Sequence, residues 1–273
     1  MISSRLASPS VSVIVPAYNE AAWLPHSLAA LVAQDYPGAF ELIVVDNGSS
    51  DQTVLVAKAH GARVVSEPRL GVAYAREAGF RAARGDLLLT TDADTLVPVD
   101  WLTNLVRLFD QHPEAVGVGG PVSYAMQDPL QRQLFETVIP LLHELDRWVH
   151  EGRGHLVGAN LAVRRTAYLA LDGFRTELTL GEDLDFSHRL AQLGPVIFAP
   201  QVRVVTSDRR FRSRGPQMVW RYFQNYLTIT KPSQSMRAKI TRAFEHYRRE
   251  LGRPRLSRRA RQTPQKESDE RTI

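Results

Sequence analysis

Over the first hundred residues, short runs of apolar residues alternate with stretches in which apolar residues recur every three or four positions. The runs have the length and β-branched composition of buried strands, and the periodic stretches are typical of amphipathic helices. The pattern predicts strands at residues 11–15, 41–45, 63–65 and 86–91. It predicts helices at residues 20–32, 51–60 and 71–84. Because strands joined by helices form βαβ units, we expect a mostly parallel sheet flanked by helices.

The pattern is less regular after residue 97. It predicts helices at residues 98–111, 130–149, 165–171, 182–193 and 217–230. It predicts further strands at residues 115–120, 161–164, 196–199 and 202–206. We expect one α/β domain over residues 1–247. Residues 248–273 are poor in apolar side chains and rich in Arg, Pro, Gln and Ser, which is typical of a disordered tail.

Composition narrows the class of protein. The chain has 273 residues and no cysteine, which excludes disulfides, thiolate catalysis and cysteine-ligated metals. No window approaches the ~20 apolar residues that span a bilayer, and the first ten residues lack the apolar core of a signal peptide. We therefore expect a cytoplasmic protein.

The positive charge is concentrated in the tail. Residues 242–261 hold eight arginines and two glutamates, so this segment carries a net charge of +6, against +5 for the whole chain. The rest of the chain is close to neutral, so we expect no nucleic-acid partner. A basic tail could contact anionic lipid at a membrane surface, although a solvated extension is the more common use of such a segment.

Polar residues follow three predicted strands where each strand ends. They are residues 16–20, residues 46–51, and the pair Asp92 and Asp94. Residues two apart in an extended segment point to the same side, and two unpaired carboxylates side by side need a cation or a proton between them. Mg²⁺ or Mn²⁺ bound to a phosphate would meet that need. A single Asp-x-Asp is more often a solvated turn, but three polar ends on one sheet edge favour a polar cleft.

The chain lacks a Gly-x-Gly-x-x-Gly segment after the first strand, which counts against a dinucleotide oxidoreductase. Asp46 could accept hydrogen bonds from a nucleobase or ribose at its strand end. The backbone amides that follow it, together with the next helix N-terminus, could face a phosphate.

The order of these motifs resembles the family 2 inverting glycosyltransferases of the GT-A fold, over residues 11 to about 205. The segments that carry the resemblance are Val-Ile-Val-Pro-Ala-Tyr-Asn-Glu (13–20), Val-Val-Asp-Asn-Gly-Ser-Ser-Asp (44–51), Gly-Val-Ala-Tyr-Ala-Arg-Glu-Ala-Gly (71–79), Thr-Asp-Ala-Asp (91–94) and Gly-Glu-Asp-Leu-Asp (181–185). The resemblance implies a Rossmann-like sheet and the transfer of a sugar from a UDP-, GDP- or dTDP-linked donor to an acceptor. It also implies a divalent metal, Mg²⁺ or Mn²⁺.

The resemblance assigns the donor site to the first half, residues 9–120. The residues that would line the nucleotide pocket are Pro16, Ala17, Tyr18, Glu20, Asp46, Gly71, Arg76 and Asp92. Among them Asp46 would hold the base, and Asn47 departs from the aspartate that the family more often has beside it. Arg76 would reach phosphate or base, unless it forms a surface salt bridge. Asp94 would bind the metal, with Asp92 on the ribose or on a metal-bound water.

The resemblance assigns the acceptor side to residues 121–247. Asp183 would be the general base, with Glu182 as the second choice; without the other motifs, both would be the ordinary acidic first turn of a helix. Gly158 and Asn160 would lie near the sugar and acceptor. Arg209 and Arg210 suit a diphosphate, although a basic surface turn is about as common.

There are two rival functions, one within the enzymes and one among the binding proteins. A sugar-phosphate nucleotidyltransferase would open with a glycine-rich basic loop, which is missing, and a catalytically inactive carbohydrate-binding or nucleotide-sugar-binding protein would not need Asp92, Asp94 and Asp183 together. The processive members of the family carry Gln-x-x-Arg-Trp, and the segment at 217–220 lacks the arginine. We therefore expect a non-processive, metal-dependent inverting transferase.

Overall fold

The computed structural model describes residues 9–126 and 156–209, together with Gln224 and Thr228. The predicted helix at 130–149 and the basic tail lie outside these residues, as does Arg210. The predicted helix at 217–230 lies outside them except for two positions.

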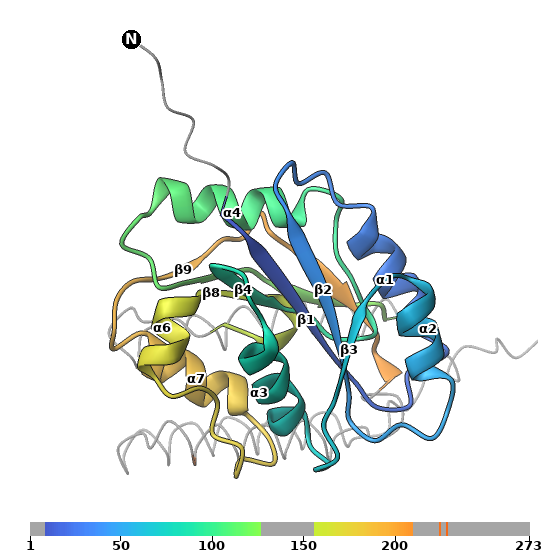
Figure 1. Cartoon of the computed structure of the whole chain (residues 1–273). Coiled ribbons are helices and arrows are strands. Elements are labelled where there is room, and N and C mark those ends of the chain that lie inside the picture. The colour runs from blue at the N-terminus through green and yellow to red at the C-terminus, as the bar shows by residue number, and fades with distance from the viewer. Residues whose placement is uncertain (1–8, 127–155, 210–223, 225–227, 229–273) are drawn as a thin grey trace, which may run out of the picture. The chain divides into compact units, whose positions relative to one another are not determined.

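A seven-stranded sheet forms the centre of the described part (Figure 1). Its strand order is β3-β2-β1-β4-β8-β6-β9, and β8 alone runs against its neighbours. The strands are β1 (Val11–Ala17), β2 (Phe40–Asp46), β3 (Arg63–Ser66), β4 (Leu87–Thr90), β6 (Gly117–Gly119), β8 (Leu161–Arg164) and β9 (Val196–Phe198). The predicted mixed α/β fold is therefore confirmed.

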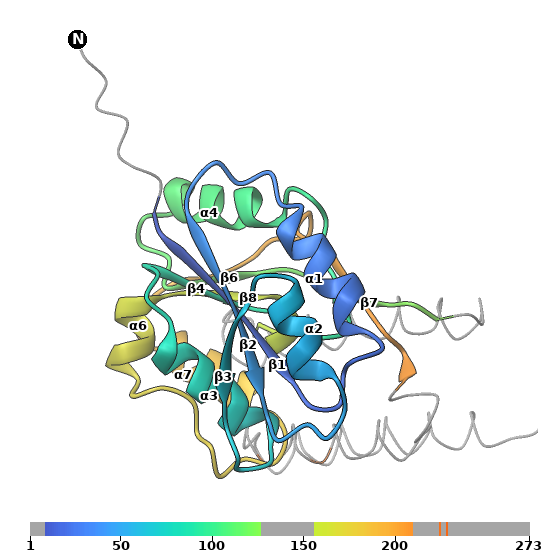
Figure 2. The ribbon, with the colours of Figure 1, turned by 45° about the vertical axis from the view of Figure 1, so that its right-hand side comes forward.

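Helices cover both faces of this sheet, as Figures 1 and 2 show. The cluster of buried side chains on one face includes α1 (Leu24–Val32), α2 (Thr53–Ala59) and α4 (Trp101–Gln111). The cluster on the other face includes α3 (Val72–Ala82), α6 (Arg165–Ala170) and α7 (Glu182–Leu190). Neighbouring residues of a strand face opposite clusters: in β4, Leu87 and Leu89 pack on one side and Leu88 on the other.

The strand predicted over 115–120 contains β6, and it is followed by a strand that was not predicted and that belongs to a second sheet. The chain leaves β6 at Gly119, passes Pro121, and pairs again as β7 (Val122–Tyr124) with β10 (Val204–Thr206). Proline has no N–H to donate to a strand ladder, which favours a break in the pairing between β6 and β7 at Pro121. β10 also pairs antiparallel with β5 (Thr95–Leu96), which brings the residues after β10 next to Asp94.

Several helices start later than their sequence patterns predict. The chain at residues 20–23 forms a turn before α1, where Trp23 N–H and Leu24 N–H both donate to the Glu20 carbonyl. Asn19 before it has a left-handed backbone with φ of 54°. The apolar periodicity of residues 20–32 thus includes a polar turn at the sheet edge, and this turn carries site residues.

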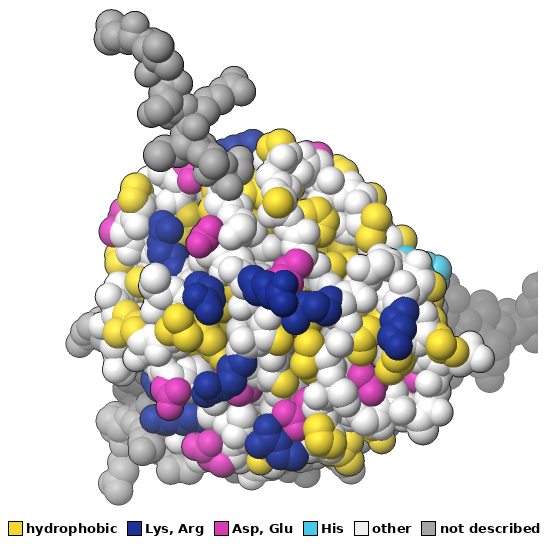
Figure 3. Space-filling view, viewed as in Figure 1, with side chains coloured by type: hydrophobic (Ala, Val, Ile, Leu, Met, Phe, Trp, Pro, Cys, Tyr) yellow, Lys and Arg dark blue, Asp and Glu magenta, His cyan; other side chains and the backbone are white. Residues whose placement is uncertain are grey.

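Within the described residues, no helix is both long and apolar enough to cross a bilayer. Figure 3 shows acidic and basic side chains next to one another over the lower part of one face, where Figure 1 places α3, α6 and α7. The hydrophobic side chains on this face are dispersed between them. The visible face therefore has a mixed charge rather than one sign.

Candidate active site

The candidate site lies at the edge of the main sheet where β1, β2 and β4 end. The parallel register places Ala17 beside Asp46 and Ile14 beside Thr90, so the loops that follow these strands share one edge. β8 runs antiparallel, so its amino end lies there too, with Leu161 beside Thr90. The 3₁₀ turn η1 (Gly158–Asn160) leads into β8 at this edge.

The loops after β1 and β2 are fastened to each other. Asn19 N–H donates to Ser49 Oγ at 3.0 Å, and Ser50 N–H donates to Asn19 Oδ1 at 2.8 Å. Glu20 N–H donates to the Thr53 hydroxyl at 2.8 Å. Among the predicted nucleotide-pocket residues, Tyr18 and Gly71 are exposed, Pro16 is half-buried and Ala17 is buried. Asp46 accepts Ser49 N–H at 3.2 Å.

Asn47 holds the loop between β3 and α3 against β2. Its amide nitrogen donates to the carbonyls of Glu67 at 2.8 Å and Arg69 at 2.7 Å, and its amide oxygen accepts Gly71 N–H at 2.8 Å. An aspartate could accept from Gly71 but could not donate to the two carbonyls. Sequence reasoning treated Asn47 only as a departure from the family pattern and missed this role; its unusual identity beside Asp46 was the available signal.

Arg76 joins the Asp-x-Asp motif to the acidic motif of α7. Its guanidinium donates to Asp92 Oδ1 at 2.7 Å and to Glu182 Oε1, and its side chain is only 5% exposed. Burial alone would lower the pKa of Arg76, but the charges of Glu182 and Asp92 outweigh it and raise the pKa above the usual range. Arg76 therefore stays charged and fixes two carboxylates that come from distant parts of the chain.

Gly158 allows this arrangement because a Cβ at that position would overlap the Arg76 guanidinium. Its N–H donates to Asp183 Oδ2 at 2.8 Å, and Leu184 N–H donates to Asp183 Oδ1 at 2.9 Å. These two bonds orient the Asp183 carboxylate beside the cluster. Burial, followed by the charge of Asp183 and opposed by that of Arg76, raises the pKa of Glu182 to about 7.

Asn160, which we expected near the acceptor, is fully buried. Its amide oxygen accepts the Trp101 indole N–H at 2.9 Å, and its amide nitrogen donates to the Val202 carbonyl at 2.7 Å. These bonds occupy the side chain between α4 and the segment before β10. Asn160 therefore joins the 3₁₀ turn to α4 and to the segment before β10, and its place near the acceptor stays a prediction.

Asp94 lies in a second cluster. Its Oδ2 accepts Arg209 Nε at 2.8 Å and its Oδ1 accepts the Thr206 hydroxyl at 3.2 Å. The same guanidinium donates to Glu20 Oε1 and lies 5.6 Å from the centre of the Trp23 ring. Two predicted donor-site carboxylates thus share one arginine.

The carboxylates of Asp92 and Asp94 are the oxygen ligands that Mg²⁺ and Mn²⁺ prefer. Residues 9–126 and 156–209 hold no group of three or more His, Cys, Asp or Glu that could bind a metal by itself. Both oxygens of Asp94 already accept hydrogen bonds. The donor set therefore fits a metal that takes its other ligands from a diphosphate and water.

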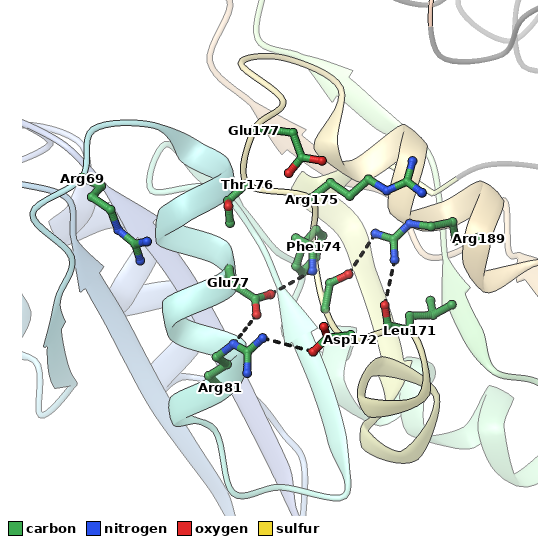
Figure 4. A pocket seen from close by; sticks show the side chains of 11 residues that line it. Arg69, Glu77, Arg81, Leu171, Asp172, Phe174, Arg175, Thr176, Glu177 and Arg189 are labelled. Atoms are coloured by element: carbon green, nitrogen blue, oxygen red, sulfur yellow. Dashed lines mark hydrogen bonds and ion pairs between the residues drawn. The ribbon is translucent and has the colours of Figure 1, made fainter.

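A pocket of about 500 Å³ lies apart from these two clusters, between α3, the turn after α6 and α7 (Figure 4). Glu77 lies at its wall, accepts Phe174 N–H at 2.8 Å and pairs with Arg81. Gly173 has a left-handed φ of 79°, and a Cβ there would overlap the Glu77 carboxylate. The Phe174 ring stacks on Phe186 of α7 at 4.3 Å. Glu77 thereby fastens the start of the segment that leads to Glu182 and Asp183, and Arg76 holds its other end.

Comparison with known proteins is consistent with this site. Residues 12–171 match the family model described as "Glycosyl transferase family 2". An uncharacterized glycosyltransferase of Mycobacterium tuberculosis is 39% identical over 111 residues, which are 41% of this chain and 49% of that protein. The chain thus spans about half the length of the curated relatives it matches.

Two solved structures have similar folds. Glucosyl-3-phosphoglycerate synthase from Mycobacterium tuberculosis, in complex with Mn²⁺, UDP-glucose and phosphoglyceric acid, has a TM-score of 0.62 and 22% identity, with 83% of this chain and 81% of that chain covered. A mannosyltransferase from Pyrobaculum calidifontis, in complex with GDP-Man and Mn²⁺, has a TM-score of 0.56 and 29% identity, with 72% and 56% covered. The fold is the GT-A fold. Since the family model covers more than half of the residues, the chain belongs to glycosyltransferase family 2.

Proposed function

We propose that this chain catalyses metal-dependent, inverting and non-processive transfer of a sugar from a nucleotide-diphosphate donor to an acceptor hydroxyl. One observation carries the proposal: the Arg76 guanidinium binds Asp92 of the donor motif and Glu182, which is the neighbour of the proposed general base, Asp183. The two motifs that the reaction needs are separated by about ninety residues and meet on one buried cation.

Asp183 is suited to the role of base by its surroundings. Two backbone N–H groups, from Gly158 and Leu184, each donate to a different oxygen of its carboxylate. Because a carboxylate oxygen has more than one lone pair, Asp183 can still accept a proton from a hydroxyl. Glu182 is nearly fully buried and engaged with Arg76, so it is the weaker candidate.

The reaction requires one proton transfer and one displacement. Asp183 takes the proton of the acceptor hydroxyl as that oxygen attacks the anomeric carbon. The bond from this carbon to the diphosphate breaks, and its electron pair leaves with the nucleoside diphosphate. A divalent metal, held by Asp94 with Asp92, would neutralise charge on that leaving group. Arg209 can supply a second positive charge there.

The donor is a UDP-, GDP- or dTDP-sugar. The structural neighbours are complexes with UDP-glucose and with GDP-Man, and both contain Mn²⁺. In this chain, Asp46 and Asn47 begin the loop after β2, which would contact the nucleobase of the donor. The donor is tested by thermal shift with the three nucleotide-sugar classes, with and without Mn²⁺. One class should stabilise the protein in a metal-dependent way, and Asp94→Asn should lose that dependence.

The base is tested by the release of nucleoside diphosphate. Asp183→Asn should keep the donor-induced thermal shift and lose at least about 10²-fold of the release rate. Asp110→Asn, at an exposed position of α4, is the matched control and should leave both measurements unchanged. Turnover retained by Asp183→Asn would assign the base elsewhere, and no shift with any nucleotide sugar would contradict the proposed donor.

A further inference from the structure

Arg209 follows β10 and contacts two carboxylates from different loops. Nε donates to Asp94 Oδ2 at 2.8 Å, and a terminal nitrogen donates to Glu20 Oε1. Glu20 belongs to the turn after β1, and Asp94 to the segment between β4 and β5. The side chains of these two residues are 12% and 8% exposed, so each carboxylate has little water to stabilise its charge.

The position of Arg209 conflicts with the part that Asp94 plays in the proposed reaction. Thr206 and Arg209 between them use both oxygens of Asp94. A divalent cation at Asp94 would lie beside the guanidinium, and like charges at such a distance repel strongly where water is limited. The two cations therefore compete for Asp94.

The surroundings of Arg209 allow it to move. Its side chain is 29% exposed, against 5% for Arg76. Its guanidinium lies over the Trp23 ring, which is itself 38% exposed and gives the cation a surface on the open side. Its planar fork also matches phosphate oxygens as well as it matches carboxylates.

The charge balance gives the exchange a direction. Glu20, Asp94 and Arg209 together carry one negative charge, which disfavours a diphosphate. A divalent cation at Asp94 reverses the sign to one positive charge, which favours a diphosphate. Metal and nucleotide binding are therefore coupled through the guanidinium.

We propose that Arg209 is the resident counter-ion of Asp94 and Glu20 in the donor-free protein, and that it transfers to the donor diphosphate when Asp94 takes up a divalent cation. The transfer rests on the proposed function, whereas the competition for Asp94 does not. Arg209 acts as a positioning residue before donor binding and contacts the donor afterwards.

The test measures two affinities in the intact chain with Arg209→Gln. Binding of Mn²⁺ alone, followed by the electron paramagnetic resonance signal of free Mn²⁺, should become about threefold tighter, since a partly exposed competing ion pair is removed. Binding of UDP, GDP and dTDP in saturating Mn²⁺, followed by calorimetry, should weaken about tenfold for whichever one the wild type binds. Arg203→Gln, at an exposed arginine just before β10 that donates to Ser123 Oγ, should change neither.

Tighter Mn²⁺ binding together with weaker nucleotide binding distinguishes exchange of Arg209 from a role in which Arg209 only holds Asp94 in place. If Arg209→Gln weakens both affinities, or changes neither, the proposal is wrong. If it tightens Mn²⁺ but leaves nucleotide binding unchanged, the transfer to diphosphate is wrong. If the wild type binds none of the three nucleotides while Arg209→Gln still tightens Mn²⁺, the donor class of the proposed function fails and the counter-ion role stands.

A second measurement needs no substitution of Arg209. Trp23 emission should change when Mg²⁺ and the bound nucleotide are added together to the wild type, because the guanidinium leaves the ring. Trp23→Phe should remove the change and report any contribution from other tryptophans. Unchanged Trp23 emission at saturating nucleotide would show that Arg209 stays in place and would overturn the transfer.

Discussion

Two arginines balance carboxylates at the same edge of the sheet, in different surroundings. Arg76 comes from the middle of α3, is 5% exposed, and bridges Asp92 and Glu182. Arg209 comes from the segment after β10, is 29% exposed, and bridges Asp94 and Glu20. Each pair of carboxylates includes one member of the Asp-x-Asp motif.

The difference in burial separates a fixed ion cluster from one that can exchange. Removing Arg76 would leave the Glu182 side chain, which is 4% exposed, with neither water nor a cation, which is costly. Arg209 is 29% exposed, so water and ions can take its place beside Asp94 and Glu20, and the loss is smaller. A site that binds and releases a charged donor needs both kinds of ion cluster: one that keeps the geometry of the site and one whose arginine can be replaced.

Substitution of the two arginines tests this contrast directly. Arg76→Gln should lower the free energy of unfolding by roughly 3–5 kcal/mol, because it leaves buried carboxylates unpaired. Arg209→Gln should lower it by about 1 kcal/mol. Urea unfolding measures both, with Arg81→Gln on the outer face of α3 as a control at 62% exposure. Equal losses for Arg76 and Arg209 would remove the distinction.

The fixed cluster also depends on the turn that Glu77 fastens. Gly173→Ala should lower the free energy of unfolding by about 2 kcal/mol more than Gly61→Ala, because the new Cβ at position 173 would displace the Glu77 carboxylate. Gly61 has nearly the same φ, 77° against 79°, and open space around it, so it controls for backbone strain alone. Release of nucleoside diphosphate should fall in Gly173→Ala while donor binding is kept. If the two alanine variants behave alike, Glu77 does not position the segment that carries Asp183.

Titration of Glu182 sharpens the comparison further. Its pKa of about 7 in the folded state lies above the ordinary value of 4.5. Between these two pH values, Glu182 is ionised in the unfolded chain and protonated in the folded chain. Its contribution to the free energy of unfolding is therefore fully present below pH 4.5 and is lost as the pH rises through 7. The stability of the wild type relative to Glu182→Gln should therefore fall on the order of 2 kcal/mol from pH 5 to pH 8.

Thermal unfolding at several pH values measures this fall. Glu177→Gln, at an exposed position of the same segment, should follow the wild type throughout. If the difference in stability between the wild type and Glu182→Gln does not vary with pH, then Arg76 keeps Glu182 ionised and the cluster does not titrate in this range.

The alternating sheet was predictable because strand and helix periods are local properties of the chain. The predicted strands at 11–15, 41–45, 63–65 and 161–164 lie within or match β1, β2, β3 and β8. The strand predicted over 115–120 contains β6, but the prediction missed β7, which follows Pro121 and belongs to the second sheet. This division between two sheets depends on pairing with β10, about eighty residues away, and no local pattern encodes a distant partner.

The sequence alone indicated the types of group at the site and the edge where they gather. Carboxylates at strand ends can be read from the chain because parallel strands present their ends together. Only the tertiary structure decided how each charge is balanced: Arg76 on Asp92 and Glu182, and Arg209 on Asp94 and Glu20. It also decided that the Asn160 side chain is buried in the core. Ion pairs between residues up to 189 positions apart depend on burial and on the packing of whole elements, which local sequence does not contain.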